Sequence, residues 1–214
     1  MLPHLWCLPK NYKDTAGARF ELAAMNRSQR VSLIAMFTAL AIVLNFALAV
    51  PAPFASFLNY EVWEVPILVA VILMGFWSGA TVAALNALIL EFHPGALPTG
   101  PLYNLIAELS MILGVLAAQN VGQRGNWKSA TKWISATAVG AALRTVVMTF
   151  VNGVVLPQPY PVGFSMPVAA VPSTLVLVGF FNFTLALYTV PLAYSVARAI
   201  VSRYRPVFVR DMSL

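Results

Sequence analysis

The polar side chains that could do chemistry in this sequence are few, and several stand inside long apolar runs. Asn104, Asn152 and Asn182 each fall within such a run, as do the acid Glu108 and the base Arg144. An ionisable group in an apolar span is costly unless it is paired or hydrated, and such groups usually mark a functional interior. A pocket for a small polar molecule needs this combination of apolar walls and a few directional hydrogen-bonding groups.

Each of these residues also has a structural interpretation, which the sequence leaves open. An asparagine in a membrane helix can hydrogen-bond a neighbouring helix, at about 0.6 kcal/mol. Arg144 and Glu108 are expected to form a structural ion pair with each other rather than a clamp on a ligand. Glu61 and Glu64 flank Trp63 between two apolar runs and are expected to be solvated carboxylates at the membrane interface.

No familiar catalytic or metal-binding pattern accompanies these residues. The sequence has no Gly-rich phosphate loop with a Lys, so the chain is not expected to hydrolyse ATP itself. It has one cysteine, Cys7, and two histidines, His4 and His93, too few for a Cys-rich or His-rich metal site. Neither a Gly-x-Ser-x-Gly elbow nor a His-Glu-x-x-His motif occurs. The sequence therefore predicts no catalytic residue, no metal and no cofactor.

The elements that must position the polar residues are membrane-spanning helices. Sixty per cent of the residues are hydrophobic and 9% are charged, whereas a soluble domain carries about 25% charged residues. A helix needs about 20 apolar residues to cross a bilayer. Runs near that length occupy residues 31–50, 66–90, 102–121, 133–156 and 171–200. These observations predict an all-α membrane protein.

The run 66–90 is long enough for one long span or two short ones, and the basic residues favour two. With a break at residues 75–79 the chain has six spans, and both termini and the loop 124–132 share one side. That side then holds twelve Lys and Arg residues and the opposite side holds none. Because Lys and Arg collect on the cytoplasmic side, we predict a six-transmembrane-helix bundle with cytoplasmic N- and C-termini. The net charge of +6 reflects this topology rather than nucleic-acid binding.

This topology divides the chain into one domain with two basic ends. Residues 1–30 are expected to form a basic N-terminal segment, 31–203 the six-helix substrate-binding domain, and 204–214 a cytoplasmic tail. Met25 stands just before the basic flank of the first span and is a candidate start site. Asn104, Asn152 and Asn182 then lie within a few turns of the external face, so a pocket opening to that face is expected.

Several short motifs, in this order, resemble the substrate-binding S components of energy-coupling factor (ECF) transporters, most closely the riboflavin type. The resemblance covers residues 32–200. The motifs are Ala35-x-x-x-Ala39, the segment Phe57-Leu58-Asn59-Tyr60-Glu61-Val62-Trp63-Glu64-Val65-Pro66, the turn Gly75-Phe76-Trp77-Ser78-Gly79, Gly100-x-x-x-Asn104, Asn152 before an apolar-Pro stretch, and Phe181-Asn182.

The resemblance implies a multi-pass protein of the cell membrane that captures a vitamin, with riboflavin expected, from the external side. Ala35 and Ala39 would dock on a transmembrane T component, which works with two ATPase subunits. The protein would then topple in the membrane to release its ligand inside. Residues expected to contact the ligand, with the segment around the first two closing over it, are Leu58, Tyr60, Asn104, Glu108, Arg144, Asn152 and Asn182.

One position departs from the riboflavin pattern and keeps the ligand open. Riboflavin-type members are expected to carry a Lys three residues after Asn182, where this chain has Leu185. Arg144 is a candidate for the missing donor, and a different vitamin is the alternative ligand. Two other classes of protein also stay open. A secondary carrier would work without ATPases, and a membrane enzyme acting on a lipid would need Glu61, Glu64 or Glu108.

Overall fold

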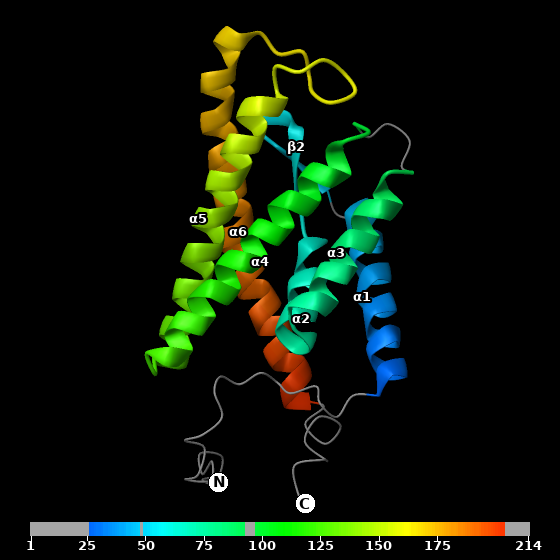
Figure 1. The fold of residues 1–214 in the computed structure, drawn as a ribbon, viewed down its shortest axis with the longest axis vertical. Coiled ribbons are helices and arrows are strands. Elements are labelled where there is room, and N and C mark those ends of the chain that lie inside the picture. The colour runs from blue at the N-terminus through cyan, green and yellow to red at the C-terminus, as the bar shows by residue number, and fades with distance from the viewer. Residues whose placement is uncertain (1–25, 48, 93–96, 204–214) are drawn as a thin grey trace, which may run out of the picture.

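The computed structural model describes residues 26–47, 49–92 and 97–203 of the chain. These residues form six α-helices, one short 3-10 helix and one two-stranded antiparallel sheet (Figure 1). In chain order the elements are α1 (Arg27–Ala47), β1 (Ala49–Ala52), β2 (Ala55–Glu61), α2 (Glu64–Met74), α3 (Phe76–Leu90), α4 (Gly100–Arg124), α5 (Ser129–Val155), η2 (Val168–Ala170) and α6 (Val171–Arg203).

Four helices are long and apolar enough to cross a membrane, namely α1, α4, α5 and α6 together with η2. The predicted break inside the run 66–90 is present, because α2 ends at Met74 and α3 begins at Phe76. These two helices have 11 and 15 residues, which at a rise of about 1.5 Å per residue gives lengths of about 16 and 22 Å. Each is shorter than the hydrocarbon core of a bilayer, about 30 Å.

Glycine permits the turn between α2 and α3. Gly75 has a φ of 85°, in the left-handed region that side chains with a Cβ rarely adopt. Gly79 lies where α3 turns back against α2, and a Cβ there would come within 2.1 Å of Val71 Cγ2. The two glycines therefore explain why this apolar run folds as a tight helical hairpin.

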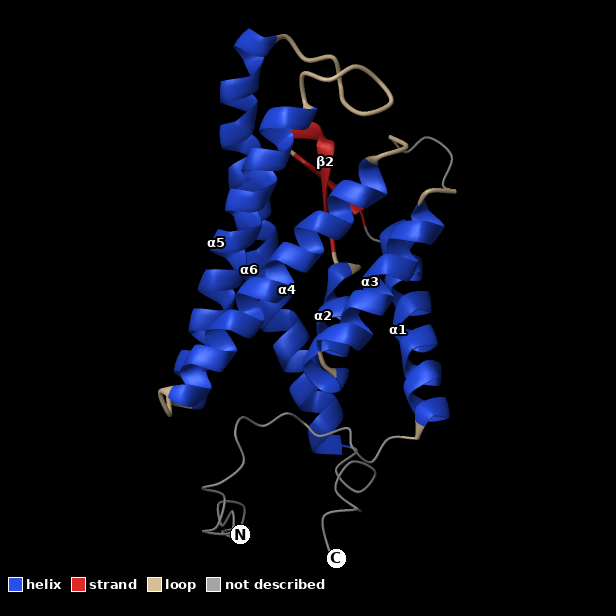
Figure 2. Ribbon diagram, in the orientation of Figure 1, coloured by secondary structure: helices blue, strands red, loops and turns tan. Residues whose placement is uncertain are grey.

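The fold is mostly helical rather than all-α, because the predicted loop after the first span is a β-hairpin. Strand β1 pairs antiparallel with β2, with Ala49 opposite Glu61 and Pro51 opposite Asn59. The first helix consequently ends at Ala47 rather than near residue 50. Figures 1 and 2 show β2 running beside the upper halves of the long helices, with α2 continuing below it. The hairpin thus enters the bundle instead of lying above it.

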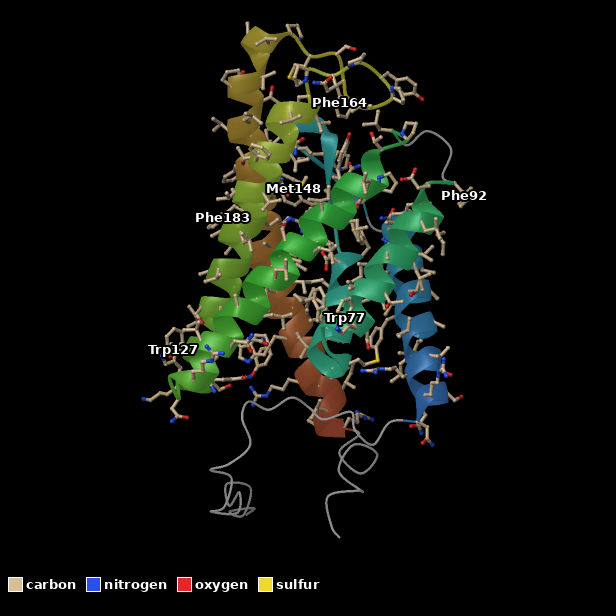
Figure 3. The ribbon with its side chains drawn as sticks, viewed as in Figure 1. Trp77, Phe92, Trp127, Met148, Phe164 and Phe183 are labelled. Atoms are coloured by element: carbon tan, nitrogen blue, oxygen red, sulfur yellow. The ribbon has the colours of Figure 1, made fainter. Side chains whose placement is uncertain are left out.

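Helix α2 forms the centre of the core. Ile67, Leu68 and Ala70 are fully buried, and they pack in one cluster with residues of α1, α3, α4, α5 and α6. The lipid-facing surface carries exposed aromatic side chains toward both ends of the bundle. Trp127 lies at the end where α4 meets α5, and Phe92 and Phe164 lie at the opposite end (Figure 3). Aromatic residues of this kind are enriched at membrane interfaces.

Helices α4 and α5 cross closely enough to bring their polar residues together. At the crossing, a Cβ on Gly114 would come within 2.8 Å of Gly140 Cα. Small residues let two helix backbones approach in this way. Arg144 lies one turn beyond Gly140 on α5, so the crossing helps to set its distance from Glu108 on α4.

Candidate ligand-binding site

A buried group of four polar residues, the Arg144 cluster, lies in the middle of the bundle. It consists of Arg144 on α5, Glu64 on α2, Glu108 on α4 and Asn182 on α6. The Arg144 guanidinium donates from Nη1 to Glu64 Oε2 and from Nη2 to Glu64 Oε1, each at 2.7 Å. Its Nε donates to Asn182 Oδ1 at 3.0 Å. Paired, doubly hydrogen-bonded charges of this type offset part of the cost of burying them.

Glu64 reaches Arg144 because of the β-hairpin. Glu64 is the first residue of α2 and is 2% exposed, so it is a buried ion-pair partner rather than a solvated interfacial acid. The hairpin carries the chain into the bundle before α2 begins, which places this carboxylate opposite the middle of α5. An acidic side chain is also favourable in the first turn of a helix, where the helix dipole is positive.

Glu108 is the second acid of the Arg144 cluster and has no hydrogen bond there. It is 0% exposed, and its Oε2 lies 3.9 Å from Arg144 Nη1. Neither carboxylate oxygen has a hydrogen-bond partner among the described residues. The expected pair of Arg144 with Glu108 is therefore the weaker contact, and the principal partner of Arg144 is Glu64. Glu108 is therefore a buried hydrogen-bond acceptor, and the guanidinium nearest to it, that of Arg144, already binds Glu64.

The β-hairpin is fastened to α6 next to this cluster. Tyr60 Oη and Thr184 Oγ1 are hydrogen-bonded at 2.7 Å, and the Tyr60 ring packs against Phe181 with ring centroids 4.9 Å apart. Tyr188 Oη donates to the backbone carbonyl of Glu61. Leu58 packs with Tyr60 against an apolar cluster that includes Leu185. These contacts join β2 to one face of α6.

Glu61 closes the hairpin at its inner end. Its carboxylate accepts a hydrogen bond from the indole N–H of Trp63. The pKa of the Glu61 carboxyl is raised from 4.5 to about 7. Burial is the largest cause, the hydrogen bond from Trp63 acts in the opposite direction, and the negative charge of Glu64 adds to the increase. Burial disfavours the charged form of a carboxyl group. This residue lies in the hairpin, outside the membrane-spanning helices.

The two other predicted asparagines, Asn104 and Asn152, make no hydrogen bond to the Arg144 cluster, although Asn104 stands one turn before Glu108 on α4. Asn104 is exposed on α4. Asn152 is half-buried on α5, and its amide donates to the Met148 carbonyl one turn earlier at 2.8 Å. His93 lies outside the described residues. Ala35 and Ala39 are both exposed on α1.

Sequence reasoning missed the two residues of α6 that hold the hairpin, Thr184 and Tyr188. They stand four apart and lie on one helical face with Phe181 and Leu185, a spacing that places side chains side by side. That stripe was visible in the sequence, but it indicates packing of any kind. Only the hairpin shows which element it contacts.

Comparisons with known proteins place this arrangement among transporter components. The family model described as "ECF transporter, substrate-specific component" matches residues 29–201. A solved structure described as "Structure and mechanism of the S component of a bacterial ECF transporter" has a similar fold, with a TM-score of 0.60 and 21% sequence identity. The similarity covers 86% of this chain and 99% of that one. No curated protein matches this chain.

Proposed function

The chain belongs to the substrate-specific components of ECF transporters, and from that premise we propose that it captures a vitamin from the external side of the plasma membrane. It is a membrane-embedded substrate-binding subunit of a transporter and not an enzyme. Riboflavin is the first candidate ligand. The alternative within the same family is another vitamin.

The observation that carries this proposal is the unfilled hydrogen-bonding capacity of Glu108. A buried polar group without a partner costs about 1–3 kcal/mol, and more when it is charged. Both Glu108 oxygens are in this state, beside the place where the hairpin meets α2. A ligand with hydroxyl or N–H donors would satisfy them, and riboflavin carries both kinds of donor. Glu108 is therefore the residue we expect to contact the ligand most directly.

The hairpin supplies the second part of the proposed site, a cover. Leu58 and Tyr60 present an apolar surface and a hydroxyl against α6. Opening this contact breaks the hydrogen bonds that Tyr60 and Tyr188 make and leaves the helices in place. We propose that the hairpin opens to admit the ligand and closes on it. Asn104 and Asn152 would contact the ligand from the rim.

The choice between riboflavin and another vitamin as the ligand depends on position 185 of α6. Leu185 is 3% exposed and packs in the cluster that the hairpin covers, so it offers no polar contact where the riboflavin type is expected to have Lys. Both terminal nitrogens of Arg144 are bound to Glu64. Arg144 therefore replaces that Lys as a ligand donor only where Glu64 releases it. Asn182 and Glu108 are the other polar groups next to the Arg144 guanidinium.

Helix α1 supplies the proposed docking surface for a T component that works with two ATPases. Ala35 and Ala39 are exposed one turn apart, and a small-residue pair lets a partner helix approach closely. Their neighbours Met36 and Leu40 are also exposed, at 51% and 44%. Bulky side chains at the two alanines would hold the partner away without touching the Arg144 cluster.

The test is uptake by proteoliposomes that contain the chain with a T component and two ATPases. The double variant Ala35→Leu with Ala39→Leu is expected to lose uptake while binding ligand like the wild type. Val43→Leu, on the same exposed side of α1, is the matched control and is expected to keep uptake. Ligand uptake that needs no ATPase partner would instead identify a secondary carrier, and the docking proposal would be wrong.

A further inference from the structure

A polar groove on α6, at the end of the bundle where that helix stops, lies far from the Arg144 cluster. Its volume is about 430 Å³, and the side chains that line it are Tyr194, Ser195, Arg198, Ala199 and Ser202. Tyr194 stacks on Trp133 of α5, with ring centroids 3.7 Å apart. The residues that line the groove all lie on α6, and Figure 1 shows α5 and α6 separating toward this end.

Arg198 is the only charged residue among those that line the groove. Its side chain is exposed, and the ion pairs found within residues 26–47, 49–92 and 97–203 all belong to Arg144. Ser195 and Ser202 each donate to a carbonyl of their own helix, Pro191 and Ala199 respectively. Their oxygens remain available as acceptors, and their hydroxyls can turn to donate to an anion.

The surroundings of the groove are those of a membrane interface with positive charge. The same end of the bundle carries Arg124, Lys128 and Lys132 around the turn from α4 to α5. Exposed apolar residues continue from the groove into the lipid-facing surface, with Leu192 at 43% and Val196 at 38% exposed on α6. A phospholipid fits a basic surface that continues into an apolar one, because its anionic headgroup and its acyl chains bind at different depths.

We propose that this groove binds the phosphate headgroup of an anionic phospholipid. The planar guanidinium of Arg198 matches two phosphate oxygens at once, and the two serines lie where they can donate to the remaining oxygens. Basic pockets between transmembrane helices on the cytoplasmic side bind lipid headgroups of this kind. In the proposed topology the groove faces the cytoplasmic leaflet. The site is independent of vitamin capture.

The test counts lipids bound to the purified full chain by native mass spectrometry. Phosphatidylglycerol and phosphatidylcholine are offered at equal mole fraction, and the wild type is expected to retain phosphatidylglycerol with at least about fivefold preference. Arg198→Gln is expected to weaken phosphatidylglycerol binding about tenfold, the factor that corresponds to about 1.4 kcal/mol. Arg203→Gln removes an exposed charge from the same end of α6 without lining the groove, and is expected to change little.

Four outcomes would overturn the proposal. Equal losses in the Arg198 and Arg203 variants would show general electrostatic attraction. Binding of soluble glycerol phosphate as tightly as of phosphatidylglycerol would show a site for free phosphate compounds. A wild type without preference between the two lipids would exclude a headgroup site, whatever the variants do. Loss of lipid on adding a T component would assign the groove to that partner instead.

Discussion

The Arg144 cluster makes a quantitative prediction about which acid stabilises the protein. Glu64→Gln removes the charge that faces Arg144 and turns one of the two accepting oxygens into a donor. Each charge-assisted hydrogen bond contributes about 1.5–3 kcal/mol, and breaking one side of a buried pair costs about 3–5 kcal/mol. Glu64→Gln is therefore expected to lower the free energy of unfolding by about 3–5 kcal/mol.

Glu108→Gln is the matched change in the same cluster. Glu108 makes no hydrogen bond among the described residues and lies 3.9 Å from Arg144, so little is lost, and a buried carboxylate without a partner is removed. The free energy of unfolding is expected to change by less than about 1 kcal/mol. It increases if the neutral Gln is cheaper to bury than the charged carboxylate. The two variants make the same chemical change, Glu to Gln, and are expected to differ by several kcal/mol in effect.

The assay is the thermal unfolding midpoint of the purified protein in one detergent without added vitamin. For a chain of this size 1 kcal/mol shifts the midpoint by about 2–4 °C, so Glu64→Gln is expected to lower it by roughly 10 °C. The variant that combines Glu64→Met, Arg144→Met and Glu108→Gln is expected to recover much of that loss, because no buried charge then remains in the cluster. If Glu108→Gln is as destabilising as Glu64→Gln, then Glu64 is not the principal partner of Arg144.

Three further predictions address the scaffold and the hairpin. Gly114→Ala forces a Cβ to within 2.8 Å of Gly140 and is expected to cost about 1–3 kcal/mol of stability in the same unfolding assay. Gly153→Ala is the control and is expected to have little effect, because the nearest atom to its Cβ lies at 3.6 Å. Tyr60→Phe removes the hydrogen bond to α6 and is expected to raise the ligand dissociation rate about fivefold, equivalent to about 1 kcal/mol; an unchanged rate would show that the hairpin does not retain the ligand. The Glu61 carboxyl has a folded-state pKa of about 7, raised from 4.5, so its contribution to stability is full below pH 4.5 and is lost as the pH rises through 7. The protection factors of the hairpin amides, which correct for the intrinsic rise of hydrogen exchange with pH, should fall over that range in the wild type and stay constant in Glu61→Gln.

Much of the helical architecture could be predicted from hydropathy and charge. The break at 75–79 follows from the asymmetry of basic residues, and the structure places a helix end at Met74 and a helix start at Phe76. The hairpin could not be predicted in the same way. Its strands have 4 and 7 residues and contain Pro51, which is atypical of a strand interior.

The candidate site was predictable by residue type but not by pairing. Depth along each helix placed Arg144 and Glu108 near one another, and the structure brings them to 3.9 Å. The sequence predicts an external loop before α2 and therefore a solvated Glu64 at the membrane interface. Once that chain enters the bundle, Glu64 lies at the level of Arg144 and takes both of its terminal nitrogens.

Vitamin capture is tested by identifying the small molecule that the purified protein holds. The chain would be purified in mild detergent from rich medium, its absorbance spectrum recorded, and any bound small molecule identified by mass spectrometry. We predict about one bound vitamin per chain, with a flavin spectrum if the ligand is riboflavin, and a loss of that ligand in Glu108→Ala. A protein that carries no small molecule and binds none of a panel of vitamins, riboflavin included, would contradict it.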